Sequence, residues 1–169
     1  ELNTITYNAA VSSCAKGGQW DRALRLFVEM ASSHVELNTI TYNAAVSACE
    51  KGGQWVKALG ILAEMTPARI ESSTITYSAA VSACEKGGEW AQASQLVREM
   101  VDGHVGRDII IYNAAVSACE RSGHWAQALQ LLRAMVEDHV NMDTITYNAA
   151  LSTCEKGREW LQALQLFRE

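Results

Sequence analysis

The sequence contains a single proline, Pro67, only two phenylalanines and no excess of positive charge. No apolar run approaches the roughly 18 residues that a membrane-spanning helix needs, so we expect no membrane span. A basic and apolar leader of the secretory type is missing as well. The formal net charge of −5 argues against nonspecific attraction to nucleic acid, because cations that neutralise phosphates produce that attraction. Whether the chain attracts nucleic acid depends, however, on the charge of the binding face alone.

Patterns typical of catalysis and metal binding are missing too. The sequence has no Cys-x-x-Cys pair, no glycine-rich loop after a strand, no nucleophile elbow and no recurrent acid–base pair. We therefore predict that the chain is not an enzyme and has no catalytic residue, metal, cofactor or small-molecule substrate. Its five evenly spaced cysteines argue against disulfides between neighbouring helices, because packed helices lie about 8–10 Å apart and a disulfide needs Cα atoms within about 7 Å. A reduced compartment fits this pattern.

The sequence contains instead one phrase of 35 residues that recurs to the end of the chain without insertion or deletion. A fixed period of this size predicts a solenoid of stacked units, in which any function lies on a face that successive units share. Each period supplies one tyrosine, one cysteine and one tryptophan. These residues are Tyr7, Tyr42, Tyr77, Tyr112 and Tyr147, then Cys14, Cys49, Cys84, Cys119 and Cys154, and finally Trp20, Trp55, Trp90, Trp125 and Trp160.

Each unit contains two stretches with helical spacing. With Thr4 as position 1, apolar residues at positions 4, 7, 8 and 11 follow the i, i+3, i+4, i+7 pattern, and a second apolar set begins at the tryptophan. A Lys-Gly-Gly turn separates the two stretches in the first three units, and an Asn, Ser or Asp suited to N-capping precedes each unit. We predict an all-α fold, a right-handed α-solenoid of stacked helix-turn-helix hairpins. It forms a single segment over 1–169, with repeats at 4–38, 39–73, 74–108, 109–143 and, in part, 144–169.

Each unit also has a set of residues at fixed positions that can be compared with those of known helical repeats. In the first unit these are Thr6-Tyr7-Asn8, Gly18, Ala23-Leu24, Leu26-Phe27 and Met30. The set resembles the P-type pentatricopeptide repeat over the full chain. The tetratricopeptide repeat fits less well, because its period is 34 residues and its tryptophan lies early in the first helix. The variant phrase Ala-Ala-Val-Ser-Ala-Cys-Glu-Lys-Gly-Gly resembles the large repeat arrays of algal, plastid-bearing protists.

The chain departs from the family at the end of the unit. The usual Gly-x-x-Pro-Asp ending is lost, and Arg158 replaces the turn glycine of the fifth unit. We therefore expect loops of a different shape. Both ends of the chain fall inside the repeat pattern, so we expect a slice of a longer array that lacks its targeting segment. Position 31, where the family has glycine, is occupied by His34, Arg69, His104 and His139.

Three positions of the first helix form a candidate surface for RNA. Isoleucine at position 2 suits packing on a base, a polar residue at position 5 suits a base edge, and a cation at position 13 suits a phosphate. The base-packing candidates are Ile5, Ile40, Ile75, Ile110 and Ile145. The phosphate-contacting candidates are Lys16, Lys51, Lys86, Arg121 and Lys156.

The resemblance implies that positions 5 and 35 act as a pair that selects one base. By the family's rule the four pairs prefer C or U, then C, G and U, from 5′ to 3′. Ser78→Asn should then move the third preference from G towards U. The pairs are Asn8 with Asn38, Asn43 with Ser73, Ser78 with Asp108, and Asn113 with Asp143, while Asn148 has no partner in the chain.

Structural interpretations of the same residues stay open. Residues at position 35 suit helix capping alone, and a lysine before a glycine turn suits the negative end of the helix dipole. Isoleucine at position 2 is also compatible with packing between neighbouring units. Glutamates at position 12 precede most of the cations and weaken their attraction for phosphate. They are Glu50, Glu85, Glu120 and Glu155.

We expect sequence-selective binding of single-stranded RNA, with one base per repeat. By resemblance the role is RNA processing, stability or translation in an organelle, a plastid or a mitochondrion. The alternative is a protein-binding scaffold or a structural subunit of an organellar assembly, such as a ribosome or a photosynthetic complex, whose other proteins are then the partners. The acidic total and the lost Pro-Asp ending favour this alternative, since solenoids also bind proteins on their concave surfaces.

Overall fold

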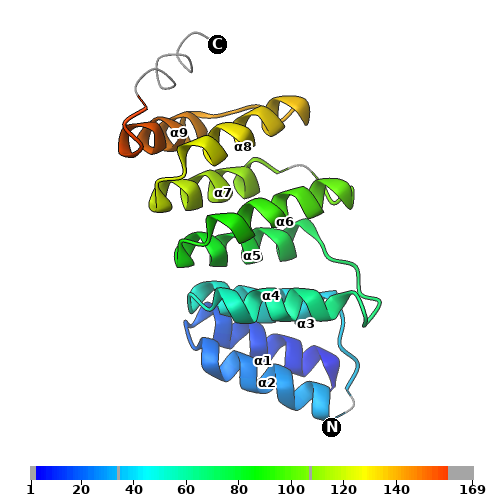
Figure 1. Cartoon of the computed structure of the whole chain (residues 1–169). Helices are drawn as coiled ribbons and strands as arrows, with labels where there is room; N and C mark the ends of the chain where they lie inside the picture. Colours follow the sequence, from blue (N-terminus) through cyan, green and yellow to red (C-terminus); the bar gives the residue numbers. More distant parts are fainter. Residues whose placement is uncertain (1–2, 34, 107, 160–169) are drawn as a thin grey trace. The chain divides into compact units, whose positions relative to one another are not determined.

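The structure is a computed structural model, and it describes residues 3–33, 35–106 and 108–159. The described part of the chain is all-α and consists of helical hairpins (Figure 1). Parts of the predicted pattern, namely His34, Trp160 and the end of the fifth repeat, lie outside the described residues. The helices are α1 (Thr4–Lys16), α2 (Trp20–Ser32), α3 (Thr39–Lys51), α4 (Trp55–Met65), α5 (Thr74–Gly87), α6 (Trp90–Asp102), α7 (Ile109–Ser122), α8 (Trp125–Glu137) and α9 (Thr144–Lys156).

The chain divides into two units, Glu1–Ala83 and Cys84–Glu169, and the division falls inside α5. In the first unit, α1 packs against both α2 and α3, and α3 packs against α2 and α4 (Figure 1). In the second unit, α7 packs against α6, α8 and α9. The first helices α1, α3 and α7 therefore each contact their own second helix and the first helix of an adjoining hairpin. The predicted all-α fold of stacked hairpins is confirmed.

The repeated apolar residues form the core of each unit. Met30 and Met65 are fully buried in the first unit, as are Met100 and Met135 in the second. The tyrosine lies between the two helices of its hairpin, where the Tyr7 hydroxyl donates to Glu29 Oε1 at 3.2 Å. The methionines are therefore core residues. The four described tryptophans are half-buried.

The cysteines are free thiols, and all except the half-buried Cys14 are buried. Burial raises the pKa of Cys49 and of Cys119 to about 11 and the pKa of Cys84 to about 12. These thiols therefore stay protonated at neutral pH and pack as small apolar groups.

The loops keep a left-handed residue at position 31, where the family has glycine, and a change of shape in the rest of the loop stays a prediction. Arg69, His104 and His139 have φ values of 57°, 55° and 56°, and Arg158 has 59°. The reason is a hydrogen bond that closes the helix end. After Arg69, His104 and His139, the N–H of the next residue donates to the carbonyl of the buried methionine five residues earlier, for example Val140 to Met135 at 2.8 Å. After Arg158, the N–H of Glu159 donates to the carbonyl of Cys154 at 2.9 Å. This bond holds a non-glycine residue in the left-handed region.

None of the helices in the described ranges is long and apolar enough to cross a lipid bilayer.

Candidate nucleic-acid interface

The isoleucine at position 2 of each repeat is exposed on the first turn of its helix. Ile5 is 77% exposed and the other four are 60–63% exposed. An isoleucine that packed between neighbouring repeats would be buried, so the packing interpretation of position 2 is wrong. Each first helix instead presents a large apolar side chain to solvent, next to the polar residue at position 5 one turn later.

Positions 5 and 35 meet in every pair that lies within one unit. The side-chain amide of Asn8 donates to Asn38 Oδ1 at 3.3 Å, and the amide of Asn43 donates to Ser73 Oγ at the same distance. These two pairs lie in the first unit. In the second unit, the Asn113 amide donates to Asp143 Oδ1 at 3.3 Å and approaches Oδ2 at 3.5 Å.

The residues at position 35 are also helix caps. Asn38 Oδ1 accepts the backbone N–H of Thr41, and Asp143 Oδ1 accepts that of Thr146, in both cases within a capping box. A hydrogen bond from the backbone N–H of Thr146 is the largest cause that lowers the pKa of Asp143. One side chain at position 35 therefore both caps its helix and contacts position 5. The capping interpretation does not exclude a role of this residue in base selection.

A threonine completes each pair, and the sequence analysis did not single it out. The hydroxyls of Thr41, Thr76 and Thr146 donate to the side-chain oxygens of Asn8, Asn43 and Asn113 at 2.6, 2.5 and 2.6 Å. All three threonines are fully buried. Each stands at position 3 of the following repeat. The recurrence of a β-branched polar residue off the apolar stripe of the helix was the sequence feature that could have identified them.

The remaining candidates at positions 5 and 35 lie apart from these pairs. Ser78 is half-buried on α5 in the first unit. Asp108, in the second unit, caps α7 by accepting the N–H of Ile110 at 2.9 Å. Because these two residues belong to different units, their pairing stays a prediction. Asn148 is exposed on α9, which no further described repeat follows.

The cations at position 13 are all exposed in the last turn of their helices. In the second unit, Lys156 forms an ion pair with Glu120 at 3.0 Å, and Ser152 donates to the same carboxylate at 2.7 Å. Burial raises the pKa of Glu120, but the hydrogen bonds from Ser152 and Lys156 and the charge of Lys156 outweigh it, so the pKa is lowered overall. The carboxylate is thus fully ionised at neutral pH and offsets part of the positive charge that a phosphate would meet.

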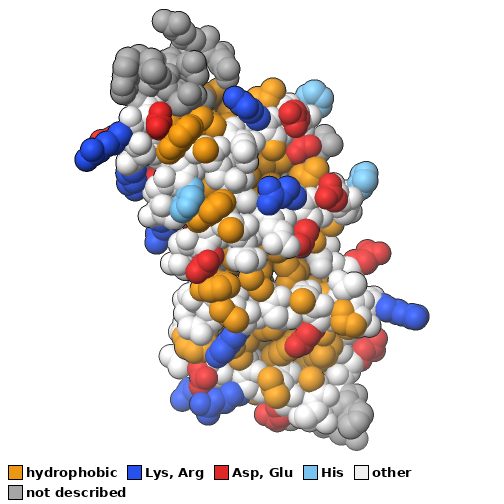
Figure 2. Space-filling model, in the orientation of Figure 1, with side chains coloured by type: hydrophobic (Ala, Val, Ile, Leu, Met, Phe, Trp, Pro, Cys, Tyr) orange, Lys and Arg blue, Asp and Glu red, His pale blue; other side chains and the backbone are white. Residues whose placement is uncertain are grey.

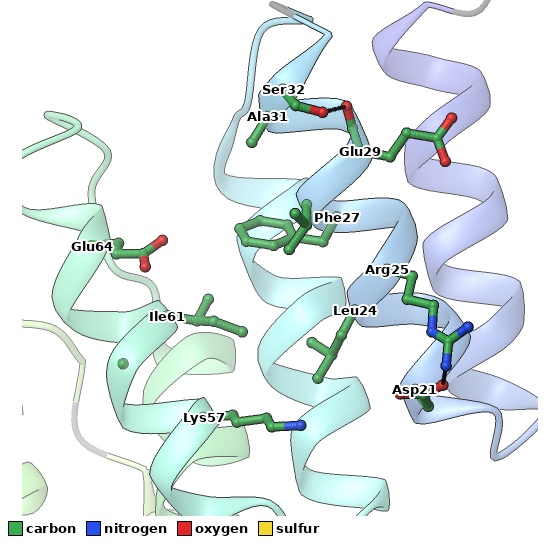
Figure 3. A pocket seen from close by; sticks show the side chains of 12 residues that line it. Asp21, Leu24, Arg25, Phe27, Glu29, Ala31, Ser32, Lys57, Ile61 and Glu64 are labelled. Carbon is green, nitrogen blue, oxygen red and sulfur yellow. Dashed lines mark hydrogen bonds and ion pairs between the residues drawn. The ribbon is translucent and has the colours of Figure 1, made fainter.

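The second helices carry a groove of a different character. Between α2 and α4 in the first unit lies a cavity of about 790 Å³. Figure 3 shows Leu24, Phe27 and Ile61 pointing into it, while charged side chains stand at its rim, among them the Asp21–Arg25 ion pair. The corresponding groove between α6 and α8 in the second unit is smaller, about 310 Å³.

Surface charge is mixed around these apolar patches. On the face visible in Figure 2, Lys and Arg side chains are interspersed with Asp and Glu, and neither sign dominates. Strong sequence-independent attraction to a polyanion therefore has no basis on this face.

Comparison with known proteins gives matches in both sequence and structure. Residues 2–51 and 107–156 match the PPR repeat family, and residues 40–66 and 75–105 match the PPR repeat. No curated protein matches the chain in sequence.

Solved structures with the same fold include two from RNA complexes. The PPR domain of Arabidopsis thaliana protein-only RNase P 1 in complex with tRNA superposes with a TM-score of 0.82 at 18% identity, over 95% of this chain and 84% of that chain. The pentatricopeptide repeat protein PPR10 in complex with an 18-nt psaJ RNA element, a protein from maize, has a TM-score of 0.79 at 25% identity, over 98% of this chain and 24% of that chain. Nuclear proteinaceous RNase P 2 from Arabidopsis thaliana has a TM-score of 0.88 at 14% identity, over 99% of this chain and 38% of that chain. The chain thus spans about a quarter of the length of PPR10.

Proposed function

Since the chain belongs to the pentatricopeptide (PPR) repeat family, we propose that it binds single-stranded RNA and selects one base per repeat. One observation carries the proposal: every repeat exposes an isoleucine beside the polar side chain at position 5. A monomeric protein rarely leaves the same large apolar side chain exposed in five successive repeats unless something covers it.

The geometry supports a division of labour within each repeat. The isoleucine supplies an apolar surface on which the face of a base packs, and the pair of positions 5 and 35 supplies polar atoms at its edge. In the first unit, the Asn8–Asn38 and Asn43–Ser73 pairs favour C or U and then C by the family's rule. In the second unit, Asn113–Asp143 favours U. Ser78 with Asp108 favours G.

The charges of the chain indicate how phosphate contacts and base contacts share the binding of RNA. The chain has a net charge of −5, and a carboxylate holds Lys156 in an ion pair. Phosphate contacts therefore contribute little, and base contacts carry most of the binding. Four complete repeats contact few bases, so the chain binds weakly on its own, and a longer array would supply higher affinity. The biological role that fits is RNA processing, stability or translation in a plastid or mitochondrion.

The test is selection from a randomised pool of short single-stranded RNAs at physiological salt, followed by equilibrium binding to the selected sequences. We expect enrichment of pyrimidine at the first, second and fourth of four consecutive nucleotides and of G at the third. Ser78→Asn should move the third preference to U, whereas Ser13→Asn, the same change at an exposed site at position 10, should leave all preferences unchanged. No enriched motif, with weak binding at every salt concentration, would reject RNA recognition.

A second function, protein binding as a scaffold or structural subunit of an organellar assembly, is favoured by the α2–α4 groove. Its apolar floor and charged rim resemble a protein–protein contact, in which apolar side chains lie at the centre and polar ones at the edge. The RNA selection distinguishes the two functions, because a scaffold would yield no motif.

A further inference from the structure

We propose that Thr76, and with it Thr41 and Thr146, is a positioning residue for base selection, because it orients the asparagine amide of the preceding repeat. The inference rests on the proposed RNA binding and adds a residue to the recognition pair. The three threonines would make each pair a triad, in which positions 5 and 35 contact the base and position 3 of the next repeat fixes which atoms the base meets.

The hydrogen-bond pattern of the threonine leaves its proton little choice. The Thr76 oxygen accepts the backbone N–H of Ser73 at 3.1 Å, so its single proton points elsewhere. The nearest acceptor is Asn43 Oδ1 at 2.5 Å. Thr41 repeats the pattern, with Asn8 Oδ1 at 2.6 Å and the competing Asn38 Oδ1 at 3.1 Å. A donor held in this way faces the carbonyl oxygen of the asparagine amide and not its NH₂ group.

The orientation of the amide decides the chemistry that is presented to RNA. With its oxygen held by the threonine, the Asn43 amide gives one N–H to Ser73 and keeps one N–H for a ligand. A free donor matches N3 and O2 of cytosine, which accept, and the carbonyl oxygens of uracil. It opposes the N1–H and N2–H donors of guanine, whose Watson–Crick edge has O6 as its single acceptor. A flipped amide would present its oxygen and would accept guanine instead.

The residue at position 35 determines how much the threonine matters in each triad. The Asp143 carboxylate can only accept, so it keeps the NH₂ group of Asn113 turned towards it without help. Asn38 is partly fixed by its own capping bond to Thr41. The Ser73 hydroxyl can donate or accept and imposes no orientation. Thr76 is therefore the most decisive of the three threonines.

The sequence shows the same association. Asn8, Asn43 and Asn113 are each followed by a threonine at position 3 of the next repeat. Ser78, which has no amide to orient, is followed by isoleucine, Ile111. The one repeat that lacks a threonine at position 3 is thus the repeat that follows a serine at position 5.

Thr6 provides the matched control for capping. It stands at position 3 of the first repeat, and its hydroxyl donates to the cap residue Asn3 at 3.1 Å. No asparagine of a preceding helix contacts it within the described residues, and it is exposed. Thr6→Val thus removes a capping hydroxyl without removing an amide contact.

The experiment measures equilibrium binding of the whole chain to two short RNAs that differ only in C or G at the nucleotide opposite Asn43. We expect Thr76→Val to reduce the preference for C roughly 2–10-fold, the equivalent of one hydrogen bond. Thr76→Ser, which keeps the hydroxyl, should restore the preference. Thr41→Val should reduce it less at the nucleotide opposite Asn8, Thr146→Val least at the nucleotide opposite Asn113, and Thr6→Val at none.

Circular dichroism and thermal melting establish that each variant is folded, and Thr41→Val provides the same test if Thr76→Val does not fold. An unchanged C-to-G ratio in a folded valine variant would overturn the positioning role and leave RNA binding intact. Equal loss at all nucleotides would also overturn it, since that result marks a purely structural effect. If the unaltered chain itself shows no base preference, the proposed function fails, and the inference fails with it.

Discussion

The indole of Trp20 lies directly against the backbone of Gly52. A Cβ atom at position 52 would be 2.4 Å from Trp20 Cγ, closer than any real contact. Trp20 begins α2, and Gly52 ends α3 of the next repeat, so this contact joins two repeats. In the second unit, Trp125 lies against Gly157 in the same way, whereas Trp90 stacks on the His124 ring at a centroid distance of 4.1 Å. The tryptophan at the start of the second helix is thus a link to the turn of the following repeat.

Gly52→Ala should therefore destabilise the chain by about 1–3 kcal/mol, the usual cost of overpacking. The effect is steric, because Gly52 has φ −86°, which alanine adopts freely. Gly60→Ala is the control: it lies inside α4 with nothing within 4 Å of the added Cβ, so it should stabilise by about 1 kcal/mol. Urea denaturation measures both. Equal effects of the two substitutions would show that the Trp20 contact does not constrain position 52.

The sequence alone was sufficient for the hairpins, because helical spacing and glycine turns act within one unit. It was insufficient for contacts that arise only when units stack. Trp20 lies at core spacing within its own unit, and only the next repeat places it over Gly52. Thr41 lies off the apolar stripe of α3, yet it is fully buried because the preceding hairpin covers it. The candidate site was found only in part for the same reason: positions 5 and 35 could be picked out within one unit, whereas the contact of the threonine with position 5 exists only between two stacked repeats.

The loops show a second limit of sequence reasoning. Loss of glycine at position 31 predicted a different loop, but His139 keeps φ at 56°. A non-glycine residue in this region costs about 1–2 kcal/mol, and the surrounding hydrogen bonds offset the cost. The conformational propensity of a residue indicates which backbone angles it prefers. It does not include the angles that hydrogen bonds of neighbouring residues impose.

His139→Gly should accordingly stabilise the chain by about 1 kcal/mol, because glycine adopts the left-handed region without strain. Glu137→Gly is the matched control. It lies two residues earlier in the last turn of α8, where glycine should destabilise by about 1 kcal/mol. Thermal melting of the two variants should give shifts of opposite sign. A loss of stability in His139→Gly would mean that the imidazole makes a contact that outweighs the backbone strain.

Stability should depend on pH through Asp143. The hydrogen bond from the backbone N–H of Thr146 lowers its pKa below the ordinary value of 3.8 in the folded chain. A lowered folded-state pKa contributes stability above the unfolded-state pKa, and this contribution is lost as pH falls through the folded-state value. The advantage of the unaltered chain over Asp143→Asn should therefore shrink below about pH 4 in urea denaturation. Asn38→Asp, which places a carboxylate at the same cap in the first unit, should gain the same dependence. A constant difference across this range would show that Asp143 gains no charge-dependent stability from Thr146.

RNA affinity should rise when Glu120 loses its charge. Its carboxylate lies 3.0 Å from Lys156 Nζ, and Glu120→Gln keeps an acceptor for the Ser152 hydroxyl while it releases the ammonium group. If Lys156 then binds a phosphate, the slope of log affinity against log salt concentration should become steeper by about 0.7, the value for one contact to a single strand. Glu137→Gln removes the same charge from the exposed end of α8 and should leave the slope unchanged. Fluorescence anisotropy with a pyrimidine-rich RNA at several salt concentrations measures both variants. An unchanged slope in Glu120→Gln would remove Lys156 from the phosphate-contacting residues, and base contacts alone would then have to hold the RNA at this repeat.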